Sequence, residues 1–107
     1  MAKYLITASY SQSGIQGVFK EGGTARVKTI KGLIKGLGGS LETFYYAFGG
    51  TDCYLIVDLP DNVTAAALGA TVAASGAVSR YETVVLLTPA ELDAAAKVSV
   101  DYRPPGS

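Results

Sequence analysis

Segments of β-forming residues alternate along the chain with segments of helical periodicity. Residues 3–10, 40–48, 53–59 and 77–87 are rich in Val, Ile, Thr, Tyr and Phe, and turn-forming residues separate them. We therefore predict four β-strands at these positions. The sequence Gly-Gly-Thr-Asp at 49–52 predicts a hairpin turn between the second and third strands.

The residues between the first two strands predict a helix that is interrupted once. A helical segment at 15–20 is followed by Gly22 and Gly23, and glycine inside a helix costs about 1 kcal/mol per residue. The helix resumes beyond these glycines, because apolar residues then recur at helical spacing (Val27, Ile30, Ile34 and Leu37).

Two further helices follow the third and fourth strands. An alanine-rich segment at 63–75 is preceded by Pro-Asp-Asn and followed by Gly76. After the fourth strand, Thr88, Pro89 and Glu91 have the spacing of a capping box with proline at the first helical position. We expect this last helix to run to about residue 98.

The predicted order is β-α-β-β-α-β with a terminal helix, which is the arrangement of a ferredoxin-like α+β domain with a four-stranded antiparallel sheet. A chain of 107 residues is one domain, since separate cores appear only at about 250–300 residues. We expect residues 1–107 to form this single domain, with 100–107 as an extended tail.

The strands alternate poorly between polar and apolar residues. A ferredoxin-like sheet that has helices on one face and water on the other should show that alternation. Strands 40–48, 53–59 and 77–87 instead carry apolar or aromatic residues at most positions. We expect a second copy of the chain to cover the remaining face, because large exposed apolar patches mark contacts. The alternative is that tyrosine side chains lie half-exposed to water.

Four stretches together resemble the GYD-domain family, small bacterial proteins of the dimeric α+β barrel superfamily. They are KYLITASYSQSGIQGVFKEGGTARVKTIKGLIKGLGG, LETFYYAFGGTDCYLIVDLPDN, AAALGATVAASGAV and LLTPAELDAAAKVSVDYRPPG. The resemblance implies a ferredoxin-like fold and a barrel formed by two sheets, and it implies no established activity. The family's hairpin reads Gly-x-Tyr-Asp. Gly49 and Asp52 match it, whereas Thr51 stands in place of the tyrosine.

Composition excludes several classes of function. Nine basic residues balance nine acidic ones, which counts against a dedicated nucleic-acid binder. The absence of histidine removes histidine-based acid–base catalysis, histidine-ligated haem and the common zinc sites, and no glycine-rich nucleotide motif occurs. We predict no metal and no cofactor. No signal-peptide pattern or apolar stretch of about 20 residues occurs, so we expect a cytoplasmic protein without membrane contact.

A few polar side chains lie inside the apolar strands and form the candidate ligand pocket: Tyr45, Tyr54, Asp58, Arg80 and Glu82. A buried charge needs a partner, so we expect Arg80 to pair with Asp58 or with Glu82. Such groups could bind a small polar ligand inside the barrel. The alternatives are a solvated strand end, a structural dimer contact, and tyrosines that serve the core or the interface.

Three other features have an ordinary structural interpretation beside a functional one. Gly49, Thr51 and Asp52 could form the rim of a pocket, or only a tight turn. Cys53 has no basic neighbour and is expected to be a small buried hydrophobic residue rather than a reactive thiol. The basic residues at 20–35 could attract anions, or form a solvated helix face.

Three functions remain open at this point. The first is a non-catalytic small-molecule-binding protein that forms a homodimer or a higher even oligomer. The second is an enzyme similar to the cofactor-independent monooxygenases or isomerases of the same superfamily, which requires Tyr45, Asp58 and Arg80 to converge in one cavity. The third is a structural protein that assembles through sheet edges, the basic helix and the tail at 102–105.

Overall fold

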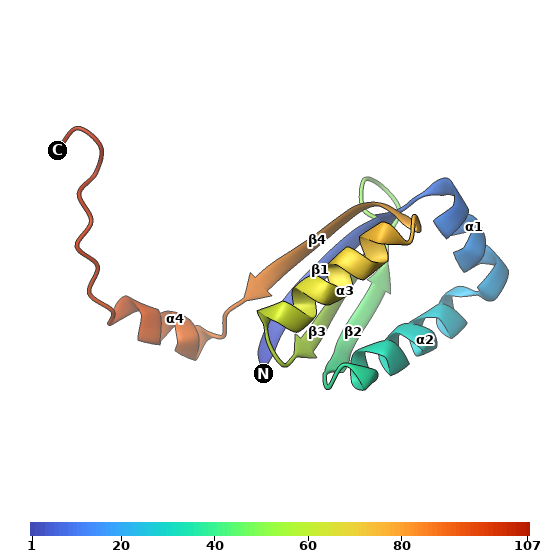
Figure 1. The fold of residues 1–107 in the computed structure, drawn as a ribbon, viewed down its shortest axis with the longest axis horizontal. Coiled ribbons are helices and arrows are strands. Elements are labelled where there is room, and N and C mark those ends of the chain that lie inside the picture. The colour runs from blue at the N-terminus through green and yellow to red at the C-terminus, as the bar shows by residue number, and fades with distance from the viewer.

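A four-stranded antiparallel sheet forms the centre of the molecule in the computed structural model, which describes all 107 residues (Figure 1). The strands are β1 (Ala2–Tyr10), β2 (Ser40–Tyr46), β3 (Cys53–Leu59) and β4 (Val78–Leu86). Their order across the sheet is β2-β3-β1-β4, and each neighbouring pair is antiparallel. This confirms the predicted ferredoxin-like α+β fold class.

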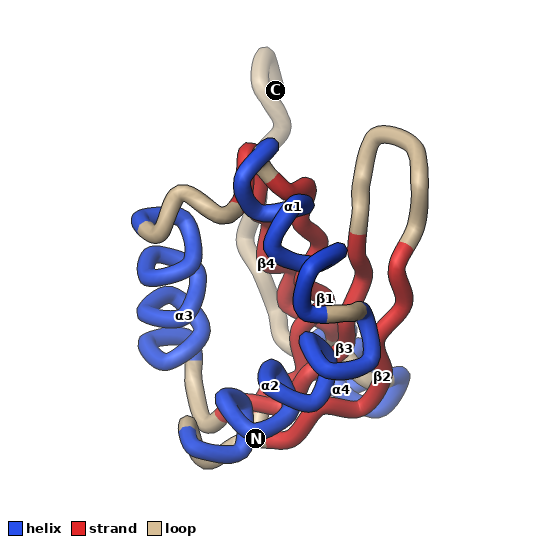
Figure 2. The backbone as a smooth tube through the Cα atoms, turned by 90° about the vertical axis from the view of Figure 1, so that its right-hand side faces the viewer, coloured by secondary structure: helices blue, strands red, loops and turns tan.

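Four helices connect and follow the strands: α1 (Gln12–Glu21), α2 (Gly23–Gly36), α3 (Asn62–Ala74) and α4 (Pro89–Ala96). The predicted interruption of the first helical segment lies at Gly22, whose φ of 96° separates α1 from α2. Figure 2 shows α3 standing apart from α1 and α2. Helix α4 and the residues after it extend away from the sheet (Figure 1).

The core lies between the sheet and α2 and α3. Tyr4, Ile6 and Ala8 of β1 face the helices and stand opposite Val57, Leu55 and Cys53 of β3. The helices add Ile34, Ala65 and Leu68 to this core. Because residues alternate between the two faces of a strand, the central strands place an apolar set on the helix side and their other residues on the opposite face.

Side-chain caps fix the starts of three helices. The Ser11 hydroxyl accepts a hydrogen bond from the Gly14 N–H at 3.1 Å, and Asp61 Oδ1 accepts one from the Thr64 N–H at 2.8 Å. These bonds satisfy N–H groups that have no partner within the helix. The bonds from Thr64 also lower the pKa of Asp61, because they stabilise its carboxylate. The predicted capping box of Thr88 and Glu91 is present at the start of α4.

Helix α1 contains two glycines, and only one of them lies where a side chain would clash. A Cβ atom at Gly14 would lie 2.0 Å from the Ala77 carbonyl oxygen, whereas a Cβ at Gly17 would meet nothing within 4 Å. The start of α1 therefore approaches the turn before β4 so closely that only glycine fits at Gly14.

We predict that Gly14→Ala and Gly17→Ala shift stability in opposite directions. Gly14→Ala should lower the free energy of unfolding by about 1–3 kcal/mol, because backbone must move to admit the methyl group. Gly17→Ala should raise it by about 0.5–1 kcal/mol, because alanine favours the helix. Urea unfolding followed by circular dichroism measures both. Equal stability of Gly14→Ala and the wild type would contradict the close approach.

Candidate functional site

All five residues of the predicted pocket lie on the face of the sheet that has no helices, which we call the open face. One row of residues crosses the four strands there, because the registers place Tyr45 opposite Tyr54, Tyr54 opposite Thr7, and Thr7 opposite Glu82. Asp58 and Arg80 lie on the same face, nearer its two ends. Tyr46, the neighbour of Tyr45, points to the helix side, where its hydroxyl donates to the Gly23 carbonyl at 3.0 Å.

The middle of the open face is apolar. Leu5 of β1 stands between Ile56 of β3 and Val84 of β4, and Thr43 of β2 completes the row. Val84 is 42% exposed, and Tyr54 and Tyr45 in the adjoining row are 43% and 70% exposed. A single chain therefore presents apolar and aromatic groups to water on the face that the sequence predicted to be covered.

At each end of the open face, the charged side chains form ion pairs with their own neighbours. Lys3 Nζ lies 2.5 Å from Glu42 and 3.1 Å from Asp58, and these two hydrogen-bonded carboxylates raise the pKa of Lys3. Arg80 pairs with Glu82 at 2.5 Å. The expected Arg80–Glu82 pair is thus confirmed. The alternative Arg80–Asp58 pair is wrong, because Asp58 pairs with Lys3.

The register explains why Arg80 and Asp58 do not meet. Asp58 stands opposite Lys3 at the beginning of β1, and Arg80 stands opposite Ser9 near its end. Six positions along a strand correspond to about 20 Å. Tyr45, Asp58 and Arg80 therefore do not converge within one chain, and the constellation required for the enzyme hypothesis is absent there.

The hairpin residues fasten the β2–β3 turn to β1. Asp52 accepts a hydrogen bond from the Tyr10 N–H at 2.8 Å, and the Ser9 hydroxyl donates to the Gly50 carbonyl at 2.7 Å. Gly49 has a φ of 148°, a conformation that favours glycine. Figure 2 shows this loop projecting beyond the end of the sheet. Asp52 thus serves the local geometry of the turn, and Thr51 has no hydrogen-bonded partner through its side chain.

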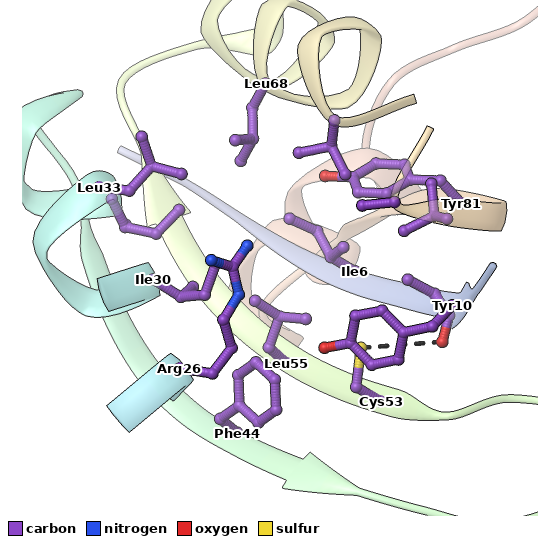
Figure 3. A pocket seen from close by; sticks show the side chains of 15 residues that line it. Ile6, Tyr10, Arg26, Ile30, Leu33, Phe44, Cys53, Leu55, Leu68 and Tyr81 are labelled. Atoms are coloured by element: carbon purple, nitrogen blue, oxygen red, sulfur yellow. Dashed lines mark hydrogen bonds between the residues drawn. The ribbon is translucent and has the colours of Figure 1, made fainter. Parts of the chain in front are cut away.

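The helix side of the sheet holds a cavity of about 70 Å³ between α2, α3 and the strands (Figure 3). Of the 15 residues that line it, 14 are hydrophobic and only Arg26 is charged. The sheet contributes Ile6 and Leu55, α2 contributes Ile30, and α3 contributes Leu68. We call this space the helix-side cavity.

A small set of polar groups borders the helix-side cavity near the hairpin end of the sheet. The Tyr10 hydroxyl lies beside the Cys53 thiol, which donates to the Ala8 carbonyl at 3.7 Å (Figure 3). Burial raises the pKa of Cys53, as predicted for a buried cysteine, and also the pKa values of Tyr10 and Tyr81. These groups are neutral at pH 7, so Arg26 is the only charge at the cavity.

Sequence reasoning missed this site because it counted Arg26 with the exposed basic residues of its helix. Arg26, Ile30 and Ile34 are spaced four residues apart and share one helix face. That spacing could have placed Arg26 on the apolar side of α2. The other basic residues of α1 and α2 (Lys20, Lys28, Lys31 and Lys35) are exposed, as expected of a solvated helix face.

The family model of the GYD domain matches residues 4–96. The chain belongs to the GYD-domain family. The match begins within β1 and ends at the last residue of α4, so it includes every residue that lines the helix-side cavity of this GYD-domain protein. Neither a search of curated proteins nor a search of solved structures finds a match. No helix of the protein has the length and apolar character needed to cross a membrane, and no cluster of three or more metal-ligating side chains occurs.

We predict that the free energy of unfolding falls as the pH rises above about 9. The ordinary pKa is 9.0 for Cys53 and 10.0 for Tyr10 and Tyr81, and burial raises all three in the folded chain. The unfolded chain therefore loses these protons at a lower pH, and alkaline conditions favour it. Urea titrations between about pH 7 and about pH 11 measure the slope. Cys53→Ala should delay its onset toward pH 10, and a flat profile would contradict the burial of these groups.

Proposed function

We propose that this GYD-domain protein is a homodimeric small-molecule-binding protein whose ligand occupies the helix-side cavity of each chain. The observation that carries this proposal is an apolar cavity with a single charged residue on its wall. Ligand sites are predominantly apolar, with a few placed polar groups that fix orientation. Arg26, Tyr10 and Cys53 supply such groups on an otherwise hydrophobic surface.

The helix-side cavity has room for a small apolar group of a ligand. Well-packed protein interiors have few spaces larger than a water molecule. The helix-side cavity of about 70 Å³ is about half the size of an engineered apolar cavity of about 150 Å³ that stays dry and binds benzene. A short alkyl group or part of a ring therefore fits the available space.

A second copy of the chain is the proposed partner of the open face. The row through Leu5, Ile56 and Val84 crosses the sheet, and the charges on either side of it are already paired within the chain. A twofold-related copy would place apolar residues on apolar residues and leave no charge without a partner. Two such sheets face to face form the barrel that the family resemblance implies.

Within that dimer, the predicted pocket residues on the open face become contact residues between the two sheets. This role applies to Tyr45, Tyr54, Asp58, Arg80 and Glu82. Their function as a ligand pocket inside the barrel stays a prediction.

Neighbouring valines on β4 provide a matched test of the dimer. Val84 and Val85 are 42% and 54% exposed, and they point to opposite faces of the sheet. Val84→Lys should produce a monomer of 11.0 kDa, because it places an unpaired ammonium group in the apolar centre of the interface. Val85→Lys should leave the dimer intact. Native mass spectrometry measures both variants.

A wild-type protein that is monomeric in this experiment would contradict the proposed dimer. Dissociation of both valine variants to the same extent would also contradict it, because the effect would then not depend on the open face. Circular dichroism of each variant establishes that the chain is still folded.

A structural role in assembly is the second candidate, and the C-terminal arm (residues 87–107) favours it. Helix α4 has no buried residue, and Leu92, Val98, Val100 and Tyr102 are between 61% and 76% exposed. Within the arm, only Leu87 and Thr88 connect β4 to Pro89, where α4 begins. The arm extends away from its own sheet (Figure 1). Its apolar residues are therefore available to another copy.

Removal of residues 89–107 tests this second candidate. If the arm joins dimers, the full chain should occur as a multiple of the dimer, and the shortened chain should occur as the dimer alone. A chain that lacks only residues 104–107 is the control and should assemble as the full chain does. A full chain that is no larger than a dimer would contradict the assembly role.

A further inference from the structure

The helix-side cavity adjoins a second, more polar hollow. A cleft of about 250 Å³ lies between α1, the start of α2 and the turn before β4. Its lining includes Tyr10, Glu21, Arg26 and Ala77. Tyr10, Arg26 and Ala77 also line the helix-side cavity. An apolar space and a polar space therefore meet at these three residues.

Arg26 stands at this junction without a partner. It is half-buried, and it forms neither an ion pair nor a side-chain hydrogen bond. Every other basic residue is either exposed or, like Lys3, paired with a carboxylate. Figure 3 shows the Arg26 side chain extending among the apolar residues of the cavity. A cation withdrawn from water favours an anionic partner.

We infer that the ligand of this protein is an amphipathic carboxylate, with a short apolar tail in the helix-side cavity and its carboxylate on Arg26. This inference rests on the proposed function. The planar guanidinium can donate two parallel hydrogen bonds to a carboxylate, which makes arginine well suited to this anion. Tyr10, which lines both spaces, offers its hydroxyl as a further donor.

Glu21 is the one acidic residue that lines the cleft. It lies farther than ion-pair distance from Arg26, since the two form no salt bridge. Its negative charge opposes a bound carboxylate, so Glu21→Gln should strengthen binding. A neutral ligand would be insensitive to this substitution. The charge on Glu21 therefore provides a second, independent test of the ligand's charge.

Hexanoate and 1-hexanol are suitable probes because they have tails of equal length and differ in charge. Titration of each into the full-length protein, followed by the NMR shifts of Ile6 and Leu68, gives both affinity and location. The wild type should bind hexanoate about tenfold more tightly than 1-hexanol, since hydrogen bonds to charged groups are worth at least a factor of ten.

Three variants distinguish recognition of the charge from general effects on the fold. Arg26→Gln should remove the preference for hexanoate over 1-hexanol. Arg26→Lys keeps the charge without the planar fork and should retain part of the preference. Lys28→Gln removes an exposed charge from the same helix and is the matched control, with wild-type affinities expected for both probes.

The outcomes separate this inference from the proposed function. Equal affinity for the two probes, or a preference that survives in Arg26→Gln, would overturn the carboxylate inference and leave ligand binding in the cavity intact. If neither probe shifts Ile6 or Leu68, the proposed function fails together with the inference. If Arg26→Gln lowers the unfolding temperature, the Glu21→Gln variant still tests the charge of the ligand. This variant should bind hexanoate more tightly than the wild type does, and its affinity for 1-hexanol should not change.

Discussion

The antiparallel register of β1 and β3 is the constraint on which the rest of the structure depends. It places Tyr4, Ile6 and Ala8 opposite Val57, Leu55 and Cys53 on one face, and helices cover that face. A shift by one residue would move each of these groups to the opposite face. The same register places Leu5 beside Ile56 on the open face, and together with the β1–β4 register it separates the charges of Asp58 and Arg80. The helix-side core and the proposed dimer contact thus follow from one pairing.

The sequence predicts local structure well because turns and caps act over a few residues. The glycine break at Gly22, the capping box at Thr88 and the four strands all depend on near neighbours, and the structure confirms them. Partners across the sheet depend on a register that no local pattern specifies. For that reason Lys3 was not recognised as the partner of Asp58, and Arg26 was not recognised as part of a cavity built from six elements.

The buried tyrosines and the cysteine at the helix-side cavity are neutral at pH 7, which is compatible with the proposed ligand binding there. Burial raises the pKa values of Tyr10, Tyr81 and Cys53, so none of them is poised to exchange a proton near pH 7. The guanidinium of Arg26 is the one charged group on the wall of the cavity. A cavity with fixed protonation and one permanent charge is suited to recognising an anion rather than to transferring protons.

The proposed ligand and the proposed second copy occupy opposite faces of the sheet, the ligand on the helix side and the second copy on the open face. Isotope-filtered NOE measurements on the hexanoate complex test this division most directly, because they identify the methyl groups next to the ligand. We predict contacts from the alkyl chain to Ile6 and Leu68 and none to Leu5 or Ile56. Contacts to Leu5 and Ile56 in place of Ile6 and Leu68 would contradict it and put the ligand between the two sheets.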